Sequence, residues 1–437
     1  MRCLKNWLAF GLSTLLTPVY ATDLNDLAKE YVLLSLAMGG HDAAYVDAYY
    51  GPVEWQTEVK AHPLALATIG QRALTLQTEL AKQSPCSESH CSAESAEGLR
   101  LEYLRKQLLA LLARLEMLQG KPFSFDQETA ALYDTVAPTF SRDYFLAIHQ
   151  EISALLPGSG SLALRINAFR RQFVIPKDKL KGVFEAAIQG CRQRTLAHLP
   201  LPAGENFTLE FVTDKPWSGY NWYQGNYQSL IQINVELPIY IERAVDIGCH
   251  EGYPGHHTYN ALLEKNLVKD RGWREFSVYP LWSPQSLIAE GSANYGVELA
   301  FSDAERVTFE REVLYPLAGL NPALAAQYET LRKLLGKLSY ADNEAAREYV
   351  DGRIDREQAI EWLINVELYP AEKARQRTQF FDANRGYVIN YNVGKDLVKD
   401  YVGRQTASAK TEAEATDSRW TAFVTLLSSP RLPSGLK

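Results

Sequence analysis

The sequence predicts a mainly α-helical protein that carries a small antiparallel β-sheet. Apolar residues recur at three- and four-residue steps in long stretches such as Leu24–Met38 and Ala96–Leu118, the spacing of one buried helix face. Similar helical stretches occur near residues 141–155, 177–197, 304–339, 354–367 and 417–428. The alternation typical of strands appears in Asn206–Asp214 and again in Tyr227–Asn234.

The region around the predicted strands introduces the remaining elements. Lys215–Gln224 is rich in aromatic and turn-forming residues, so we expect it to be a loop between the two strands. Pro238 suits the first turn of a helix, which we expect to cover Ile239–Leu262 with one interruption. Ser84–Ala96 and Gln405–Thr416 are polar and of low complexity, and we interpret them as insertions within one domain.

Composition and charge restrict the classes of partner. The chain has 437 residues, of which 46% are hydrophobic and 22% charged, which is typical of a globular protein. A net charge of −7 argues against nucleic acid as the main partner. No apolar run reaches the roughly 18 residues of a membrane span, so we expect no stable membrane insertion. The oligomeric state stays open.

The N-terminus resembles a secretory signal peptide. Arg2 and Lys5 precede an apolar stretch, and Ala21 lies where a signal peptidase would cleave. We therefore expect residues 1–21 to be removed, residues 22–437 to form a single domain, and the mature protein to be periplasmic or secreted.

The cysteines allow several interpretations. Cys86 and Cys91 lie in a Ser-rich loop, where they would form a local disulfide, bind a metal together with His90, or remain free thiols. Cys191 and Cys249 are expected to be buried as small apolar side chains.

The segment His250-Glu251-Gly252-Tyr253-Pro254-Gly255-His256-His257 carries the strongest chemical signal. It resembles the H-E-x-x-H pattern, in which two histidines bind zinc and the glutamate is the general base. Neutral imidazoles bind zinc without cancelling its charge, and a neighbouring carboxylate takes a proton from the attacking water. The sequence thus predicts one zinc ion, with His250 as a ligand and Glu251 as the base.

The spacing of the histidines departs from that pattern. On an ideal helix His256 would lie about 120° around the axis from His250, and His257 would lie roughly 10.5 Å along it. Neither pair would chelate one ion on a straight helix. A bulge at Pro254 and Gly255 would bring His256 back toward His250, so we expect His256 to be the second ligand. His257 remains the alternative and would otherwise support the site or face the substrate.

A third ligand is expected from the following helix. A zinc hydrolase has three protein ligands, and Glu290 lies in the second turn after Pro284, with Asn294 one turn further on. Gly291 is expected to let this helix approach the helix of His250 closely. Asp246, one turn before His250, either orients an imidazole or lies on an ordinary helix surface.

These motifs together resemble a known family. HEGYPGHH followed by AEGSANY is similar to the HExxPGHH family of bacterial proteins, catalogued as domain-of-unknown-function family eight-eight-five and regarded as zinc metallopeptidases. A weaker third motif matches at Gly386, Tyr391 and Gly394. The resemblance implies a large helical zinc-peptidase-like body with a deep channel. Ser292 stands where the family usually has Trp.

The same resemblance leaves the oxyanion donor open. Arg385-Gly386-Tyr387 replaces the usual Pro-Gly-Gln, and Phe380-Phe381 replaces an Arg-Tyr pair. A phenol or a guanidinium stabilises a developing oxyanion, so Tyr387, Tyr391 and Arg385 are the catalytic candidates.

The function predicted from the sequence is that of a zinc-dependent metallopeptidase of the carboxypeptidase or oligopeptidase type. The expected substrate is a peptide or a small amide, paired with strand Tyr227–Asn234 and bordered by the aromatic residues Trp217–Tyr223. Two alternatives remain: a zinc hydrolase of other amides or esters, and a non-catalytic protein that binds metal or peptide.

Overall fold

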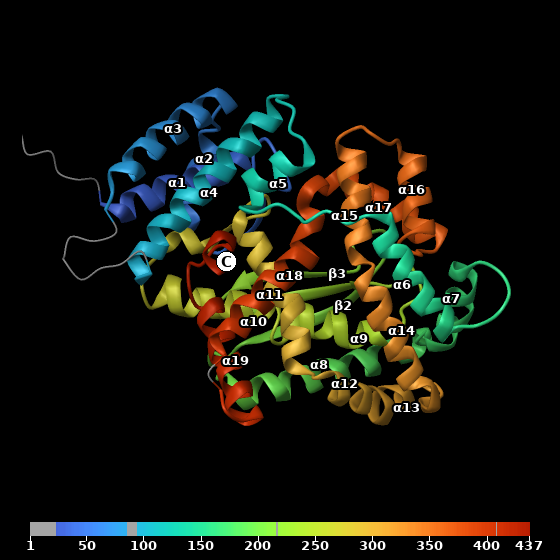
Figure 1. Ribbon diagram of the computed structural model, residues 1–437. Coiled ribbons are helices and arrows are strands. Elements are labelled where there is room, and N and C mark those ends of the chain that lie inside the picture. The colour runs from blue at the N-terminus through green and yellow to red at the C-terminus, as the bar shows by residue number, and fades with distance from the viewer. Residues whose placement is uncertain (1–22, 85–93, 216, 408) are drawn as a thin grey trace, which may run out of the picture.

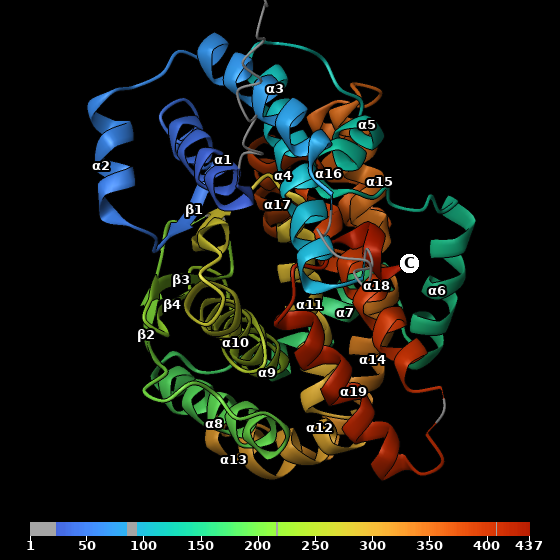
Figure 2. The ribbon, with the colours of Figure 1, turned by 90° about the vertical axis from the view of Figure 1, so that its left-hand side faces the viewer.

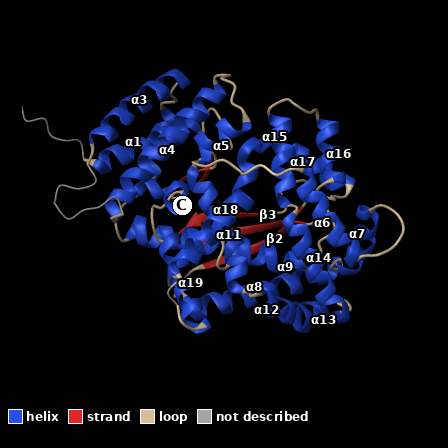
Figure 3. Cartoon of the chain, in the orientation of Figure 1, coloured by secondary structure: helices blue, strands red, loops and turns tan. Residues whose placement is uncertain are grey.

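The protein is built mainly of helices, as the sequence predicts (Figures 1 and 3). The computed structural model describes residues 23–84, 94–215, 217–407 and 409–437. The expected signal peptide, residues 1–21, and the pair Cys86 and Cys91 lie outside these ranges. Within them, no helix is both long enough and apolar enough to cross a membrane.

The elements follow one another along the chain with short connections. The α-helices are α1 (Leu24–Met38), α2 (Val53–Ala61), α3 (Leu66–Lys82), α4 (Ala96–Leu118), α5 (Phe125–Tyr133), α6 (Arg142–Leu155), α7 (Leu162–Arg170), α8 (Leu180–His198), α9 (Glu242–Ile247), α10 (His256–Leu263), α11 (Pro284–Ala300), α12 (Asp303–Phe309), α13 (Tyr315–Ala318), α14 (Ala325–Lys337), α15 (Ser339–Val350), α16 (Arg356–Asn365), α17 (Ala371–Asn384), α18 (Ile389–Gln405) and α19 (Glu412–Leu427). The strands are β1 (Val46–Tyr49), β2 (Asn206–Val212), β3 (Gly219–Gly225), β4 (Gln228–Asn234) and β5 (Val278–Pro280).

Helices α1 and α4 have the bounds that the apolar spacing predicts, and their N-termini show why they begin there. Asp23 accepts a hydrogen bond from the backbone N–H of Asn25, and Ser95 accepts one from that of Gly98. The helical stretch near 304–339 is divided instead. Gly319, at a φ of 71°, ends α13, and the chain resumes as a helix only before α14.

The sheet beside the motif is mixed rather than antiparallel, and the predicted aromatic loop contains a strand. Its order is β2-β4-β3, with β4 parallel to β2 and antiparallel to β3. Residues 219–225 therefore pair with β4, because a hairpin turn at Asn226 and Tyr227 folds β3 against it. A second, two-stranded antiparallel sheet joins β1 to β5.

The helices that carry the motif lie between the sheet and a pair of crossing helices. Figure 2 shows β2, β3 and β4 along one side of α10, with α11 and α18 on the other side. The pair α11 and α18 cross at Gly291 and Gly394, where a Cβ on Gly291 would lie 2.3 Å from the carbonyl carbon of Gly394. The expectation that Gly291 faces the motif is wrong, since α11 meets the bend through Gly296, next to the Pro254 ring.

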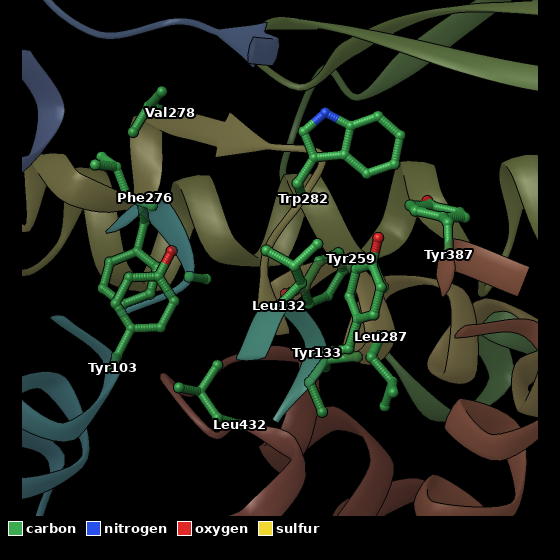
Figure 4. Close-up of a cluster of buried hydrophobic side chains, with 14 of the residues drawn as sticks. Tyr103, Leu132, Tyr133, Tyr259, Phe276, Val278, Trp282, Leu287, Tyr387 and Leu432 are labelled. Carbon is green, nitrogen blue, oxygen red and sulfur yellow. The ribbon is translucent and has the colours of Figure 1, made fainter. Parts of the chain in front are cut away.

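Three clusters of buried apolar side chains hold these elements together. The largest joins the N-terminal helices to α11 and α18, and Figure 4 shows part of it around Tyr133, Trp282 and Leu287. Tyr387 belongs to this cluster, and its ring meets those of Tyr133 and Trp282 edge-on. The cluster therefore fixes one side chain of the predicted site.

Cys191 and Cys249 are buried as expected, but they form a disulfide instead of remaining thiols. Cys191 lies on α8 and Cys249 directly before His250, and their Cα atoms are 5.4 Å apart. The two cysteines are 58 residues apart, and α8 packs against the motif segment, which brings them together. The sequence spacing contains no signal for this contact.

Candidate metal centre

The interruption predicted within the motif is present and redirects the chain. Gly248–Gly252 forms a π-helical turn, the peptide bond before Pro254 is cis, and α10 begins at His256. The backbone N–H of Gly255 donates to the carbonyl of Cys249 at 3.0 Å. A Cβ on Gly255 would lie 1.8 Å from the carbonyl oxygen of His250, so only glycine fits this return of the chain.

The bend brings His250, His256 and Glu290 together. The rings of His250 and His256 are perpendicular, with centroids 4.6 Å apart. Glu290 Oε2 lies 3.2 Å from His250 Nε2 and 3.7 Å from His256 Nε2. One candidate ligand atom from each residue falls within 4.8 Å of the other two. The structure thus unites the three side chains that the sequence nominated as metal ligands.

The donor atoms fit a zinc ion. Glu290 Oε2 is buried and accepts no hydrogen bond from any described residue, although two imidazole nitrogens face it. Zinc–ligand bonds of 2.0–2.2 Å in a tetrahedral site place neighbouring ligand atoms about 3.3 Å apart, close to these separations. Burial opposes ionisation of Glu290, but His250 and His256 outweigh it and hold its pKa well below the ordinary value.

Hydrogen bonds from outside the cluster orient two of the ligands. His250 Nδ1 donates to Asn294 Oδ1 at 3.0 Å, which leaves Nε2 as the metal-binding nitrogen. Asn294 is held in turn by donating to the carbonyl of Tyr391. The Tyr387 hydroxyl donates to Glu290 Oε1 at 2.9 Å, which turns Oε2 toward the imidazoles. Sequence reasoning did not assign Asn294 this role, although its place one turn after Glu290 was the available signal.

Asp246 does not orient an imidazole. Its carboxylate pairs with Arg306 of α12 at 2.7 Å and lies 3.7 Å from Arg243. Burial raises its pKa, but the charge of Arg306 and of other arginines outweighs burial and lowers the pKa overall. This carboxylate is committed to α12, which packs beside α9.

Glu251 lies on the wall of the site next to the sheet. Its side chain is buried, its backbone carbonyl accepts from Asn221 Nδ2 at 2.7 Å, and a Cβ on Gly219 would lie 2.8 Å from its Oε1. Burial raises its pKa to about 7; the charge of Glu290 adds to this shift, and His256 and Arg243 oppose it. A carboxyl group with this pKa can accept and return a proton near neutral pH.

The three candidates for the oxyanion donor are separated by the fold. Tyr387 and Tyr391 line the same cavity as His250 and Glu251. Arg385 is not among the described residues that line it, because its Nε donates to Glu128 of α5 at 2.7 Å. The backbone N–H of Gly386 donates to the same carboxylate, so Arg385 fixes a helix junction and lies apart from the site.

A cavity of about 1780 Å³ opens over the cluster. The predicted border by Trp217–Tyr223 is present, since every residue of this segment lines the cavity. The predicted pairing of substrate with strand Tyr227–Asn234 is wrong, because β4 is the central strand and both of its edges are occupied. The strand that borders the cavity at the edge of the sheet is β3.

A second buried acid lies in this cavity, and sequence reasoning did not find it. Asp47 of β1 accepts a hydrogen bond from the Tyr220 hydroxyl. Burial raises its pKa to about 7, and the charges of Glu290 and Glu251 add to the shift, against the charge of His256. Asp47 is about 200 residues from the motif and has no neighbouring pattern, so only the pairing of β1 with β5 brings it here.

His257 faces away from the cluster. It is fully buried, and its Nδ1 accepts from Ser229 Oγ at 2.8 Å while its Nε2 donates to Glu205 at 3.0 Å. Glu205 also accepts from Tyr253 at 2.5 Å and pairs with Arg192 at 2.6 Å. Both nitrogens of His257 are therefore occupied, and the structure favours His256 over His257 as the second ligand.

Comparison with known proteins gives no family assignment. No protein-family model and no curated protein matches the sequence. One similar solved structure is described as "the putative lipoprotein from Colwellia psychrerythraea", with 13% identity and a TM-score of 0.48 over 86% of this chain and 72% of that one. Another, "a putative lipoprotein of unknown function from Shewanella oneidensis", has 12% identity and a TM-score of 0.40 over 86% and 75%. Likenesses of this extent support no functional statement.

Proposed function

We propose that the protein is a zinc-dependent hydrolase of the metallopeptidase type, in which His250, His256 and Glu290 hold one zinc ion. The observation that supports this most is the buried Oε2 of Glu290, which lacks a hydrogen-bond donor and lies between two imidazole nitrogens. Bound zinc supplies Lewis-acid polarisation of a carbonyl group and lowers the pKa of water.

The chain's own residues then divide the remaining work. Glu251 accepts the proton of the attacking water and returns it to the leaving amine, a task that its pKa of about 7 suits at neutral pH. Tyr387 already donates its hydroxyl hydrogen to Glu290, so it positions that ligand. Tyr391 lines the cavity and remains the candidate donor to the developing oxyanion.

A peptide substrate is favoured by the shape of the cavity. A volume of about 1780 Å³ exceeds the roughly 300–1,000 Å³ of pockets for small ligands. The edge strand β3 lies along the cavity, and extended peptides bind by adding to such an edge. Edge-strand addition is thus retained as the proposed binding mode, with β3 in place of Tyr227–Asn234.

We also propose an envelope or extracellular location. The buried disulfide between Cys191 and Cys249 is typical of proteins that fold in an oxidising compartment. The signal-like residues 1–21 agree with this location.

The variant Glu251→Gln tests the mechanism. We expect it to keep stoichiometric zinc, measured by elemental analysis, and to lose about 100- to 10,000-fold in kcat/KM on peptides, because proton transfer is removed while the ligands stay. Unchanged peptide hydrolysis by a zinc-loaded Glu251→Gln protein would contradict the proposal.

The choice of substrate decides between the remaining alternatives. A matched panel of peptides, simple amides and esters should show the highest kcat/KM for peptides. Preference for esters or simple amides would identify a different zinc hydrolase. Absence of both stoichiometric zinc and chelator-sensitive hydrolysis would identify a non-catalytic protein.

A further inference from the structure

The cavity is lined by many cationic side chains, and nearly all of them are already neutralised. Those with a carboxylate within 3.3 Å are Arg306, Arg332, Lys333, Lys337, Arg377, Lys395, Lys399 and Arg419. A further cation, Arg194, donates to the carbonyl of Gly190 and lies over the Phe301 ring. These residues need no anion from a ligand.

Two cavity-lining cations lack such a partner. Lys373 of α17 forms no ion pair with any carboxylate in the described ranges, and its Nζ lies 5.5–6 Å from a ring, at 5.6 Å from the centroid of Tyr369. Arg243 of α9 reaches only Asp246, at 3.7 Å, and that carboxylate is already bound to Arg306 at 2.7 Å. Both side chains are half-buried, so water replaces the missing anion only in part.

The two cations influence one another and the reacting centre. Burial and the charges of Arg243 and Arg377 lower the pKa of Lys373 to about 8, against the opposing charge of Asp342. The charge of Arg243 also acts to lower the pKa of Glu251, so its field reaches the proposed base. Repulsion between half-buried cations is relieved when an anion binds between them.

The position of Arg243 sets the scale of the ligand. Arg243 precedes His250 by seven residues on one continuous helical segment, so the two lie on nearly the same face, about 10 Å apart along the axis. An extended peptide advances about 3.3–3.6 Å per residue. A carboxylate held there would thus follow the scissile bond by no more than about three residues.

We propose that Arg243 and Lys373 form a subsite for a substrate carboxylate, and that this carboxylate is the free C-terminus of the peptide. The inference rests on the proposed peptidase function and deepens it, since it assigns release of short fragments from the C-terminal end. The guanidinium provides the planar, two-pronged donor that suits a carboxylate, and the ammonium adds a second charge.

Binding to the zinc-loaded Glu251→Gln protein tests the subsite without turnover. The probes are one N-acetylated tripeptide as the free acid, the same peptide as its C-terminal amide, and an amide whose last residue is Glu. We expect calorimetry to show that the free acid binds about 10- to 100-fold more tightly than either amide, because charge-assisted hydrogen bonds are lost. Tight binding of the Glu-containing amide would assign the subsite to a side-chain carboxylate and overturn the terminal assignment.

Variants show which residues carry the preference. Arg243→Gln and Lys373→Gln should each remove most of the difference between acid and amide, whereas Arg243→Lys should retain part of it. The matched control is Lys395→Gln, which removes a cavity-lining lysine already paired with Glu298 and should keep the full preference. A preference that survives both Gln variants would mean that the carboxylate binds elsewhere, for example to the zinc ion.

The outcomes separate this inference from the proposed function. Preference for the free acid without hydrolysis by the wild-type protein would leave the subsite standing and refute the peptidase. Zinc-dependent hydrolysis with equal binding of acid and amide would leave the peptidase standing and refute the subsite.

Discussion

Two neighbouring residues of the motif, His256 and His257, lie in opposite environments. His256 faces the cavity, where its Nε2 lies 3.7 Å from a carboxylate oxygen that accepts no hydrogen bond from the described residues. His257 faces the sheet, where Ser229 and Glu205 occupy both of its nitrogens. The first turn of α10 sends successive side chains about 100° apart, so one enters the site and the other the core.

The difference teaches which polar clusters await a ligand. Around His257 every donor has an acceptor, and Glu205 is stabilised by three neighbours, so the cluster is complete without a ligand. Around His256 a buried acceptor lacks a donor, which costs free energy unless a cation binds. Residue type alone does not distinguish the two clusters, since each joins histidine to glutamate.

Exchanging the two histidines for alanine should break this contrast most strongly. We expect His256→Ala to lose stoichiometric zinc, with affinity reduced by more than about 100-fold, because a direct ligand is removed. His257→Ala should keep its zinc but lose about 2–3 kcal/mol of unfolding free energy, because a buried ring and two hydrogen bonds are removed. Elemental analysis and urea unfolding measure the two effects. The reverse pattern would assign the ligand to His257.

Removing the disulfide should affect stability next most strongly. The double variant Cys191→Ala/Cys249→Ala frees the residue before His250 from α8, and closing a loop of this length is worth about 4 kcal/mol. Urea unfolding of the variant and of reduced wild-type protein should give similar losses. A loss below about 1 kcal/mol would show that packing of α8 alone holds the cavity-facing half of the motif.

The pH dependence of stability sharpens the contrast on the sheet side. Burial opposes ionisation of Glu205, but hydrogen bonds from His257, Tyr253 and Arg192 outweigh it and lower its pKa. A lowered pKa contributes stability that is fully present above the unfolded value of about 4.3 and is lost as the pH falls through the folded value.

The variant Glu205→Gln isolates that contribution. The wild-type protein should be more stable than the variant at pH 7, and the gap should narrow as the pH falls below about 4. Thermal unfolding at several pH values measures it, with Glu210→Gln as the control, since Glu210 lies on the exposed face of β2 and contacts only Gln232. A gap that is constant with pH would exclude a titrating role for Glu205.

Local sequence patterns anticipated much of the helical structure. Helices α1 and α4 begin and end where their apolar spacing predicts, because a capping residue stands directly before each. Residues 219–225 were missed because their aromatic and glycine content is typical of a turn. The partner strand β4 stabilises this segment as a strand, and pairing between strands is not visible in one segment alone.

The sequence by itself determined the ligand types, the bend at Pro254 and Gly255, and the acid on the next helix, because each depends on residues within one short segment. Only the tertiary structure decided that Asn294 and Tyr387 orient the ligands, that Asp47 enters the cavity, that Arg385 leaves it for Glu128, and that Cys191 meets Cys249. Such contacts join helices and strands that are distant along the chain. They arise from how buried faces pack in three dimensions, and a one-dimensional pattern does not encode that geometry locally.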